Sequence, residues 1–515
     1  MARPEASSAT VAPCPGKGTR PVPTPAPLHP EPEIMTTSPR RSEPETMTTG
    51  TSRRAAAVDT VSSPASRTGM TLLAAALGFF MITLDATVVN VALPTIGRQF
   101  GGGITGLQWV VDGYTLAFAA LLLSAGALSD RLGASRCFAA GLTVFTLASA
   151  GCGLAPTLPA LLAARVVQGA AAALMMPASL ALIRQAYQQD AARARAIATW
   201  TAAGGAAVAA GPVFGGVLTS GLGWQAIFFI NLPVGAAALA TLTRAPRSSP
   251  RPVPLDLAGQ VAAVTALVAL TFAVIETGQD GWTSPVVAAA LAGFVLAAAA
   301  FVLIEARTRN PMVPLGLFRS RAVSITAVIG LVLNLTFYGL VFVLSLYFQQ
   351  VRGQSVLTAG LMFVPMTALI TVANLTAGRL TARYGPRLPL AGGQLLQVTG
   401  FLALIGVGPH TSTMTLLALL IPIGIGAGLS VPPLTSTLLQ AISANRAGTA
   451  SGLLSCARQI GGALGVALFG ALIAGEGSAT FLTGLHTSAL IATAALLATS
   501  AATLTLMRTT RPAGL

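Results

Sequence analysis

The chain has 515 residues, of which 53% are hydrophobic and 9% are charged, and its mean hydropathy is +0.74. A soluble domain carries about 25% charged residues, so this composition excludes a water-soluble globular enzyme. The net charge of +15 would suggest a nucleic-acid partner in a soluble protein, but here it indicates membrane topology and no nucleic acid. Four cysteines and three histidines show no metal-binding spacing, so no metal site is predicted.

The first 66 residues are rich in Pro, Ser, Thr and Arg and contain almost no bulky apolar side chains. Such a segment buries too little surface to offset the entropy of ordering, so residues 1–66 are predicted to form a disordered cytoplasmic arm. A secretory signal needs a short apolar core near its start, whereas the first apolar run here begins at Met70. Met35 and Met47 are alternative start positions.

From Met70 the chain consists of apolar runs of about 20 residues, the length that crosses about 30 Å of hydrocarbon as a helix. The sequence predicts an all-α integral membrane fold with fourteen transmembrane helices. The predicted spans are 70–92, 107–128, 137–155, 160–183, 196–219, 225–243, 257–276, 283–304, 323–348, 357–378, 387–407, 413–434, 448–473 and 484–507.

The arginines between these spans are distributed unevenly. Alternate connections hold sixteen arginines in one set, and the other set holds only Arg98 and Arg352. Positive charge collects on the cytoplasmic side of a membrane, so both termini are expected to be cytoplasmic. The expected location is the inner (cytoplasmic) cell membrane, crossed many times.

A short pattern occurs twice at a constant offset of 252 residues. Gly126, Leu128, Arg131 and Gly133 match Gly378, Leu380, Arg383 and Gly385. Internal repeats are typical of secondary transporters. We therefore predict an N-terminal six-helix bundle at 70–243, two extra helices at 257–304 and a C-terminal six-helix bundle at 323–507.

The energy source follows by elimination. A phosphate-binding loop of the form GxxxxGK[ST] requires a lysine, and the only lysine, Lys17, is followed by glycine in the N-terminal arm. We therefore expect no cofactor, and transport that is passive or driven by a gradient.

Ionisable side chains inside spans are costly and therefore informative. Asp85 lies mid-span in the first helix and Arg165 lies early in the fourth, whereas Glu276 and Arg458 are interpreted as span-end charges that reach the interface. Asp85 and Arg165 form either a structural ion pair or a site at which the carboxylate exchanges a proton as access alternates. Asp112, near the external end of the second span, either attracts cationic drugs or is a hydrated charge at the mouth.

The fifth span contains Gly211, Pro212, Gly215 and Gly216. Proline removes a backbone donor and kinks the helix, and glycines allow a neighbouring helix to come close. The alternative is ordinary packing of small residues, because the chain has 54 glycines.

These residues resemble the fourteen-span drug:proton antiporter branch of the major facilitator superfamily, a resemblance that extends from Met70 to Met507. The first span matches the L-D-x-T-V-V-N-V-A-L-P motif without gaps from Leu84 to Pro94. The other matches are G-x-L-x-D-R-x-G at Gly126 to Gly133, R-x-x-Q-G at Arg165 to Gly169, and G-P-x-x-G-G at Gly211 to Gly216. The departures include Ala134 and Ser135 in place of a basic pair, Ala207 for a glycine, Gln225 for an arginine, and Ala382 opposite Asp130 in the repeat.

The resemblance implies a role for each motif. Asp130 and Arg131 would form a cytoplasmic latch between the halves, Asp85 and Arg165 would couple proton movement, and the fifth span would bend. A substrate cavity would lie between the halves. Its expected lining residues are Asp112, Tyr114, Phe118, Tyr338 and Phe342.

We expect proton-coupled antiport of amphiphilic, cationic drugs or antibiotics, with the substrate, protons and the lipid bilayer as partners. The first alternative is a proton-coupled symporter of a small metabolite, which should place more polar groups inside both halves. The second is an integral-membrane enzyme, which needs a nucleophile and base or a metal cluster at one membrane face. No motif indicates a particular compound or an oligomeric state.

Overall fold

The computed structural model describes residues 64–243, 248, 254–442, 447–475 and 477–506, and these residues are helical with no strand among them. The predicted arm lies outside the described residues, except that the first helix already begins at Pro64, earlier than the expected start at Met70. The helices are α1 (Pro64–Phe100), α2 (Gly103–Leu132), α3 (Ala134–Gly153), α4 (Leu158–Ala186), α5 (Asp190–Leu222), α6 (Ala226–Phe229), α7 (Asn231–Leu242), α8 (Leu257–Asp280), α9 (Pro285–Arg307), η1 (Leu315–Arg319), α10 (Arg321–Leu346), η2 (Tyr347–Val351), α11 (Val356–Met362), α12 (Val364–Tyr384), α13 (Arg387–Leu404), α14 (Thr413–Gln440), α15 (Ala447–Leu472) and α16 (Ser478–Leu506).

Among the described residues, twelve helical segments are long and apolar enough to cross a membrane. The segments at two of the fourteen predicted spans are not among these twelve. One is the shorter apolar segment Ala226–Leu242, formed by α6 and α7. The other is α13, an 18-residue helix. The multi-pass helical fold is therefore confirmed, and the number fourteen is not.

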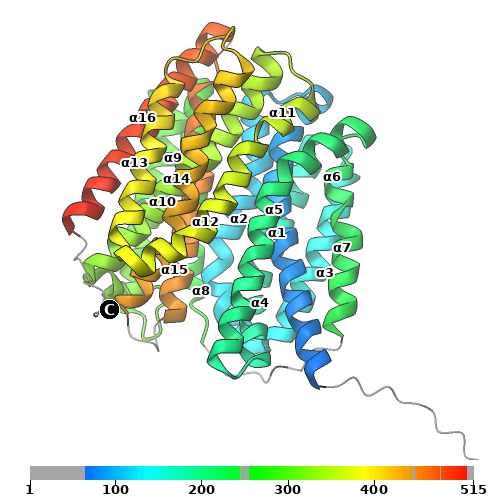
Figure 1. Ribbon diagram of the computed structural model, residues 1–515, viewed down its shortest axis with the longest axis vertical. Helices are drawn as coiled ribbons and strands as arrows, with labels where there is room; N and C mark the ends of the chain where they lie inside the picture. The colour runs from blue at the N-terminus through cyan, green and yellow to red at the C-terminus, as the bar shows by residue number, and fades with distance from the viewer. Residues whose placement is uncertain (1–63, 244–247, 249–253, 443–446, 476, 507–515) are drawn as a thin grey trace, which may run out of the picture. The chain divides into compact units, whose positions relative to one another are not determined.

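The helices pack in groups that follow the chain. In the first group α1 contacts α4, α5 and α7, and α4 also contacts α2 and α3. In the second group α10 contacts α14, α15 and α16, α14 contacts α12 and α13, and α13 contacts α16. Figure 1 shows the second group in yellow-green to red and the first in blue to green.

The pair α8 and α9 is attached to both groups through α8. The two helices pack on each other, and α8 also contacts α2 and α15. The Gln260 side chain anchors α8 by donating from Nε2 to the Ala120 carbonyl at 2.8 Å. In α9 only Val287 and Glu305 are buried, so the rest of this apolar helix presents a surface suited to lipid.

The most extensive contacts between the groups are those of α2 with α15 and of α5 with α11 (Figure 1). Small residues permit both approaches. A Cβ atom at Gly216 of α5 would lie 3.1 Å from the Leu357 Cα of α11. On the other pair, Gln108 of α2 donates to the Ala467 carbonyl of α15 at 2.7 Å.

Candidate functional site

Asp85 lies at the centre of a buried polar cluster in the first group of helices. Its side chain is fully buried, and its Oδ2 atom accepts a hydrogen bond from Arg165 Nη1 at 2.5 Å. Its Oδ1 atom accepts from Gln168 Nε2 at 2.8 Å and from Asn231 Nδ2 at 2.9 Å. One carboxylate on α1 therefore links α1 to both α4 and α7.

Arg165 is the buried cation of the cluster, with no exposed side-chain surface. Besides Asp85, it donates from Nε to the Val110 carbonyl of α2 at 3.0 Å and from Nη1 to Gln168 Oε1 at 2.8 Å. Its guanidinium carbon lies 4.3 Å from the centre of the Tyr114 ring, within the range of a cation–π contact. The ion pair and the aromatic face together compensate a charge that hydrocarbon would otherwise exclude.

Two members of the cluster, Asn231 and Ser149, were not predicted from the sequence. Asn231 donates to Ser149 Oγ at 2.8 Å, and Ser149 donates to the Phe228 carbonyl at 3.0 Å. The available signal was Asn231 itself, because an amide within an apolar run needs partners. Its partners Asp85 and Ser149 lie 146 and 82 residues away in the chain, so the sequence could not identify them.

The cluster retains unused hydrogen-bonding capacity. Arg165 Nη2 and Asn231 Oδ1 are buried without a partner among the described residues. A buried polar atom without a partner costs about 1–3 kcal/mol, so the arrangement is not saturated. A spare donor and a spare acceptor allow these side chains to re-pair when the charge on Asp85 changes.

The antiporter-like motif on α5 packs between two other helices. A Cβ atom at Gly215 would lie 2.7 Å from the Val88 carbonyl oxygen of α1, and Gly211 faces the Thr87 side chain of α1. On the other side, Gly360 of α11 packs on the Pro212 carbonyl. These small residues therefore place α5 against helices of both groups.

Pro94 creates a second junction between the groups. Proline has no N–H, so the Asn90 carbonyl in α1 lacks its usual helical partner. Ser345 Oγ of α10 donates to this carbonyl at 2.6 Å. Gln349 Nε2 of η2 donates to the next carbonyl, that of Val91, at 3.0 Å. In the expected topology these contacts close the external end of the interface.

Asp130 and Arg131, the expected latch, lie in the last turn of α2 and are exposed. Gly133, with φ of 94°, ends this helix at a conformation that favours glycine. Among the described residues neither charge forms an ion pair. The structure therefore shows the latch residues at the expected helix end, without the charge pairing.

Four of the five expected cavity residues are buried side chains. Tyr114 and Asp112 are fully buried, so Asp112 is not a hydrated charge at the mouth; one of its oxygens accepts from Thr115 at 3.2 Å, and the other has no partner among the described residues. Phe118 and Phe342 are buried within separate hydrophobic clusters. Tyr338 is half-buried on α10.

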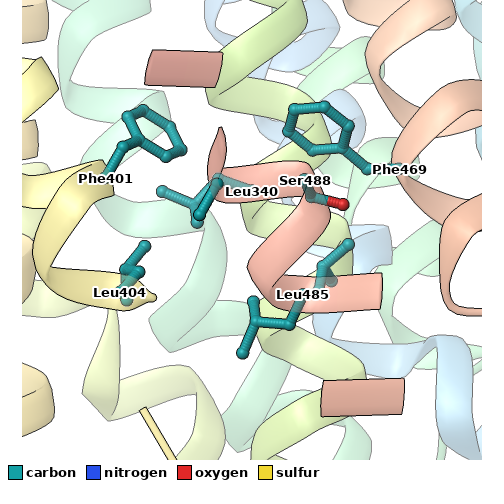
Figure 2. Close-up of a pocket in the computed structure, with 8 residues that line it drawn as sticks. Leu340, Phe401, Leu404, Phe469, Leu485 and Ser488 are labelled. Atoms are coloured by element: carbon teal, nitrogen blue, oxygen red, sulfur yellow. The ribbon is translucent and has the colours of Figure 1, made fainter. Parts of the chain in front are cut away.

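A small cavity lies inside the second group of helices. Figure 2 shows its apolar lining, which includes Phe401 of α13, Phe469 of α15 and Leu485 of α16. Its volume is about 10 Å³, close to the minimum for one water molecule, whereas small-molecule sites measure about 300–1,000 Å³. This cavity therefore reflects imperfect packing within the group and is not a substrate site.

No cluster of three or more potential metal ligands occurs in the described part of the chain. The chemistry available at the Asp85 cluster is therefore electrostatic: one carboxylate, one guanidinium and three polar side chains that can exchange hydrogen-bond partners.

Comparison with known proteins gives consistent matches. The family description of the Major Facilitator Superfamily matches residues 75–466. The Multidrug resistance protein Stp of Mycobacterium tuberculosis is 40% identical over 80% of this chain and 77% of its own length. The Methylenomycin A resistance protein of Streptomyces coelicolor is 39% identical over 79% of this chain and 86% of its own length. The Tetracenomycin C resistance and export protein of Streptomyces glaucescens is 36% identical over 78% of this chain and 76% of its own length.

A solved structure supports the fold independently. A bacterial homolog of the human lysosomal transporter Spinster, in an inward-facing and unoccupied conformation, aligns with a TM-score of 0.60 and 19% sequence identity. The alignment covers 86% of this chain and 97% of that protein.

Proposed function

Because the chain belongs to the Major Facilitator Superfamily, we propose that it exports amphiphilic drugs or antibiotics in exchange for protons. The family and the solved neighbour indicate a multi-pass membrane transporter rather than an enzyme. The export of drugs is supported by relatives named for multidrug resistance, antibiotic resistance and export. The proton gradient would be the energy source, with no bound cofactor.

The observation that carries the proton coupling is the buried Asp85–Arg165 pair with its unsaturated surroundings. A proton on Asp85 removes the negative charge that compensates Arg165, and it weakens the three hydrogen bonds that join α1 to α4 and α7. The spare capacity of Arg165 Nη2 and Asn231 Oδ1 gives the cluster a second arrangement. Proton loading thereby changes how α1 packs.

The change at Asp85 reaches the interface through α1 itself. Within three turns of Asp85, α1 contacts α5 near Val88 and α10 at the Asn90 carbonyl. Loosening this segment frees the contacts that close the external end. We propose that bundles 70–243 and 323–507 then rock about the α2–α15 and α5–α11 junctions. Asp130 and Arg131 would form the charge pairs of the cytoplasmic latch between the halves only when the external end is open.

We further propose fourteen membrane crossings with both termini cytoplasmic. The α6–α7 segment and α13 would supply the two crossings beyond the twelve, because α7 packs on α1 and α3, and α13 packs on α14 and α16. Reporter fusions after α7 and after α8 should give opposite sides, cytoplasmic first. The reverse order would show that α6–α7 does not cross.

Efflux of a fluorescent dye from energised cells tests the function. Cells that express the protein should retain less dye than cells with the empty vector, and a protonophore should abolish the difference. The Asp85→Asn variant should behave like the empty vector at equal expression. Efflux that persists with the protonophore, or in Asp85→Asn, would contradict proton coupling. Uptake of a labelled polar solute with no drug phenotype would favour a symporter.

A further inference from the structure

Arg458 lies in the middle of α15 and not near a span end, which corrects the interpretation of this residue as an interface charge. Asn334 of α10 donates to the Arg458 carbonyl at 2.9 Å, and a Cβ atom at Gly330 of α10 would lie 3.1 Å from Arg458 Cγ. Two residues earlier, on the other face of α15, Cys456 donates to the Ala119 carbonyl of α2. The backbone around Arg458 is therefore enclosed by α10 and α2.

Among the described residues, the C-terminal half of the chain offers no acidic side chain to pair with the positive charge of Arg458. The sequence contains no aspartate or glutamate between Glu305 and Glu476, and none after Glu476. In the other half, Asp85 is already paired with Arg165. Within the described residues the Arg458 guanidinium takes part in no hydrogen bond or ion pair. An arginine in the middle of a membrane-spanning helix is costly to place and marks a functional site.

The Tyr338 ring of α10 lies about one helical turn from Arg458, because it packs on Gly462, which follows Arg458 by four residues on the same face of α15. Gly462 makes room for this ring, because a Cβ atom there would lie 3.1 Å from Tyr338 Cδ2. Tyr338 lies two turns before Ser345 on the same face of α10, and Ser345 donates to the Asn90 carbonyl of α1. Both Arg458 and Tyr338 are only half-buried. Tyr338 therefore lies on the face of α10 that is turned toward α1, and Arg458 lies beside it.

We propose that Arg458 and Tyr338 form an anion-binding subsite, and that the exported compounds include amphiphiles with a carboxylate, phenolate or enolate group. This inference rests on the proposed efflux function and specifies its substrate class. The guanidinium supplies the charge and a forked set of donors that matches a carboxylate. The phenol adds one donor. Asp112, the residue considered as an attractant for cations, is fully buried and offers no exposed carboxylate.

Two dyes with one xanthene skeleton and opposite charge provide the test. Fluorescein is anionic, and rhodamine 123 is cationic. Initial efflux rates of each are measured from energised cells that express the wild type, Arg458→Gln, Arg458→Lys or Tyr338→Phe. The matched control is Arg193→Gln, which removes a partly exposed arginine that pairs with the exposed Asp190 at the start of α5. The amount of folded transporter is equalised by size-exclusion of a fluorescent fusion.

The wild type is expected to export fluorescein. Arg458→Gln should lower that rate by about tenfold or more, since a hydrogen bond to a charged group contributes at least this factor. Arg458→Lys should retain part of the rate, Tyr338→Phe should lower it by a smaller factor, and Arg193→Gln should not change it. Any rhodamine 123 efflux should change less than twofold in every variant.

Export of rhodamine 123 but not fluorescein by the wild type would overturn the anion subsite and leave the efflux function standing. An equal loss of both dyes in Arg458→Gln, or no loss, would do the same. If Arg458→Gln does not fold, unchanged fluorescein efflux in Tyr338→Phe together with full efflux loss for both dyes in Arg458→Lys would also overturn it. If the wild type exports neither dye and protects against no antibiotic, the efflux function itself fails.

Discussion

The Asp85–Arg165 pair should show strong energetic coupling in a double-mutant cycle. The perturbations are Asp85→Asn, Arg165→Gln and the double variant. Asparagine retains the shape of aspartate and an acceptor for Gln168 or Asn231, so the main loss in Asp85→Asn is the charge opposite Arg165. Both side chains of the pair are fully buried and 2.5 Å apart.

The magnitude follows from this burial. Removing one partner of a buried ion pair costs about 3–5 kcal/mol, because the other charge stays behind without compensation. The double variant leaves no charge, so its loss should be smaller than the sum of the two single losses by about 2–3 kcal/mol. The exposed pair Asp190–Arg193 on α5 is the control, for which a coupling of about 0–1 kcal/mol is expected.

Equilibrium unfolding of the purified protein in a mild detergent provides the free energies, with denaturant titration followed by tryptophan fluorescence. The double variant should lose about 2–3 kcal/mol less than the sum of the two single losses, and none of the three should move protons with substrate. Additive losses, or a coupling no larger than that of the control pair, would refute the conclusion that these two charges depend on each other.

Further predictions concern the surroundings of the pair and the helix junctions. Replacing Asn231 with leucine should lower the free energy of unfolding by about 1–3 kcal/mol, because Asp85 and Ser149 lose a buried donor; the same denaturant titration checks this. Gly215→Val should abolish dye efflux at normal expression, since its side chain would clash with the Val88 carbonyl of α1. Ser345→Ala should favour external opening by freeing the carbonyl left unpaired by Pro94. Spin labels at the external ends of α5 and α11 would then report longer distances, and an unchanged distribution would count against this role of the hydroxyl.

Much of the architecture follows from elementary constraints on a chain in lipid. Hydrocarbon requires every backbone polar group to be paired within its own helix, so runs of about 20 apolar residues predict helices directly. The first-span motif and Arg165 could be singled out because charged side chains are rare inside spans. The structure brings Asp85 of this motif into contact with Arg165. The break between α6 and α7 and the π-helical turn η2 depend on local packing, and the sequence pattern did not reveal them.

The errors concern side-chain environment rather than helix location. Asp112 was interpreted either as an attractant for cationic drugs or as a hydrated charge at the mouth. In the structure its side chain is fully buried, and it accepts a hydrogen bond from Thr115. Arg458 was interpreted as a span-end charge, but it lies mid-helix. Hydropathy gives the position of a residue along a helix axis. Which neighbour it faces depends on helix rotation and packing, which require long-range contacts.

The most direct test of the account is a measurement of proton release from the purified transporter in lightly buffered detergent solution. Fluorescein or rhodamine 123, whichever the wild type exports, is added to the wild type and to Asp85→Asn at the same pH. Binding of the dye should release protons from the wild type. The Asp85→Asn variant should still bind the dye but release no protons. Equal release from both proteins would contradict the assignment of Asp85 as the group that exchanges the proton.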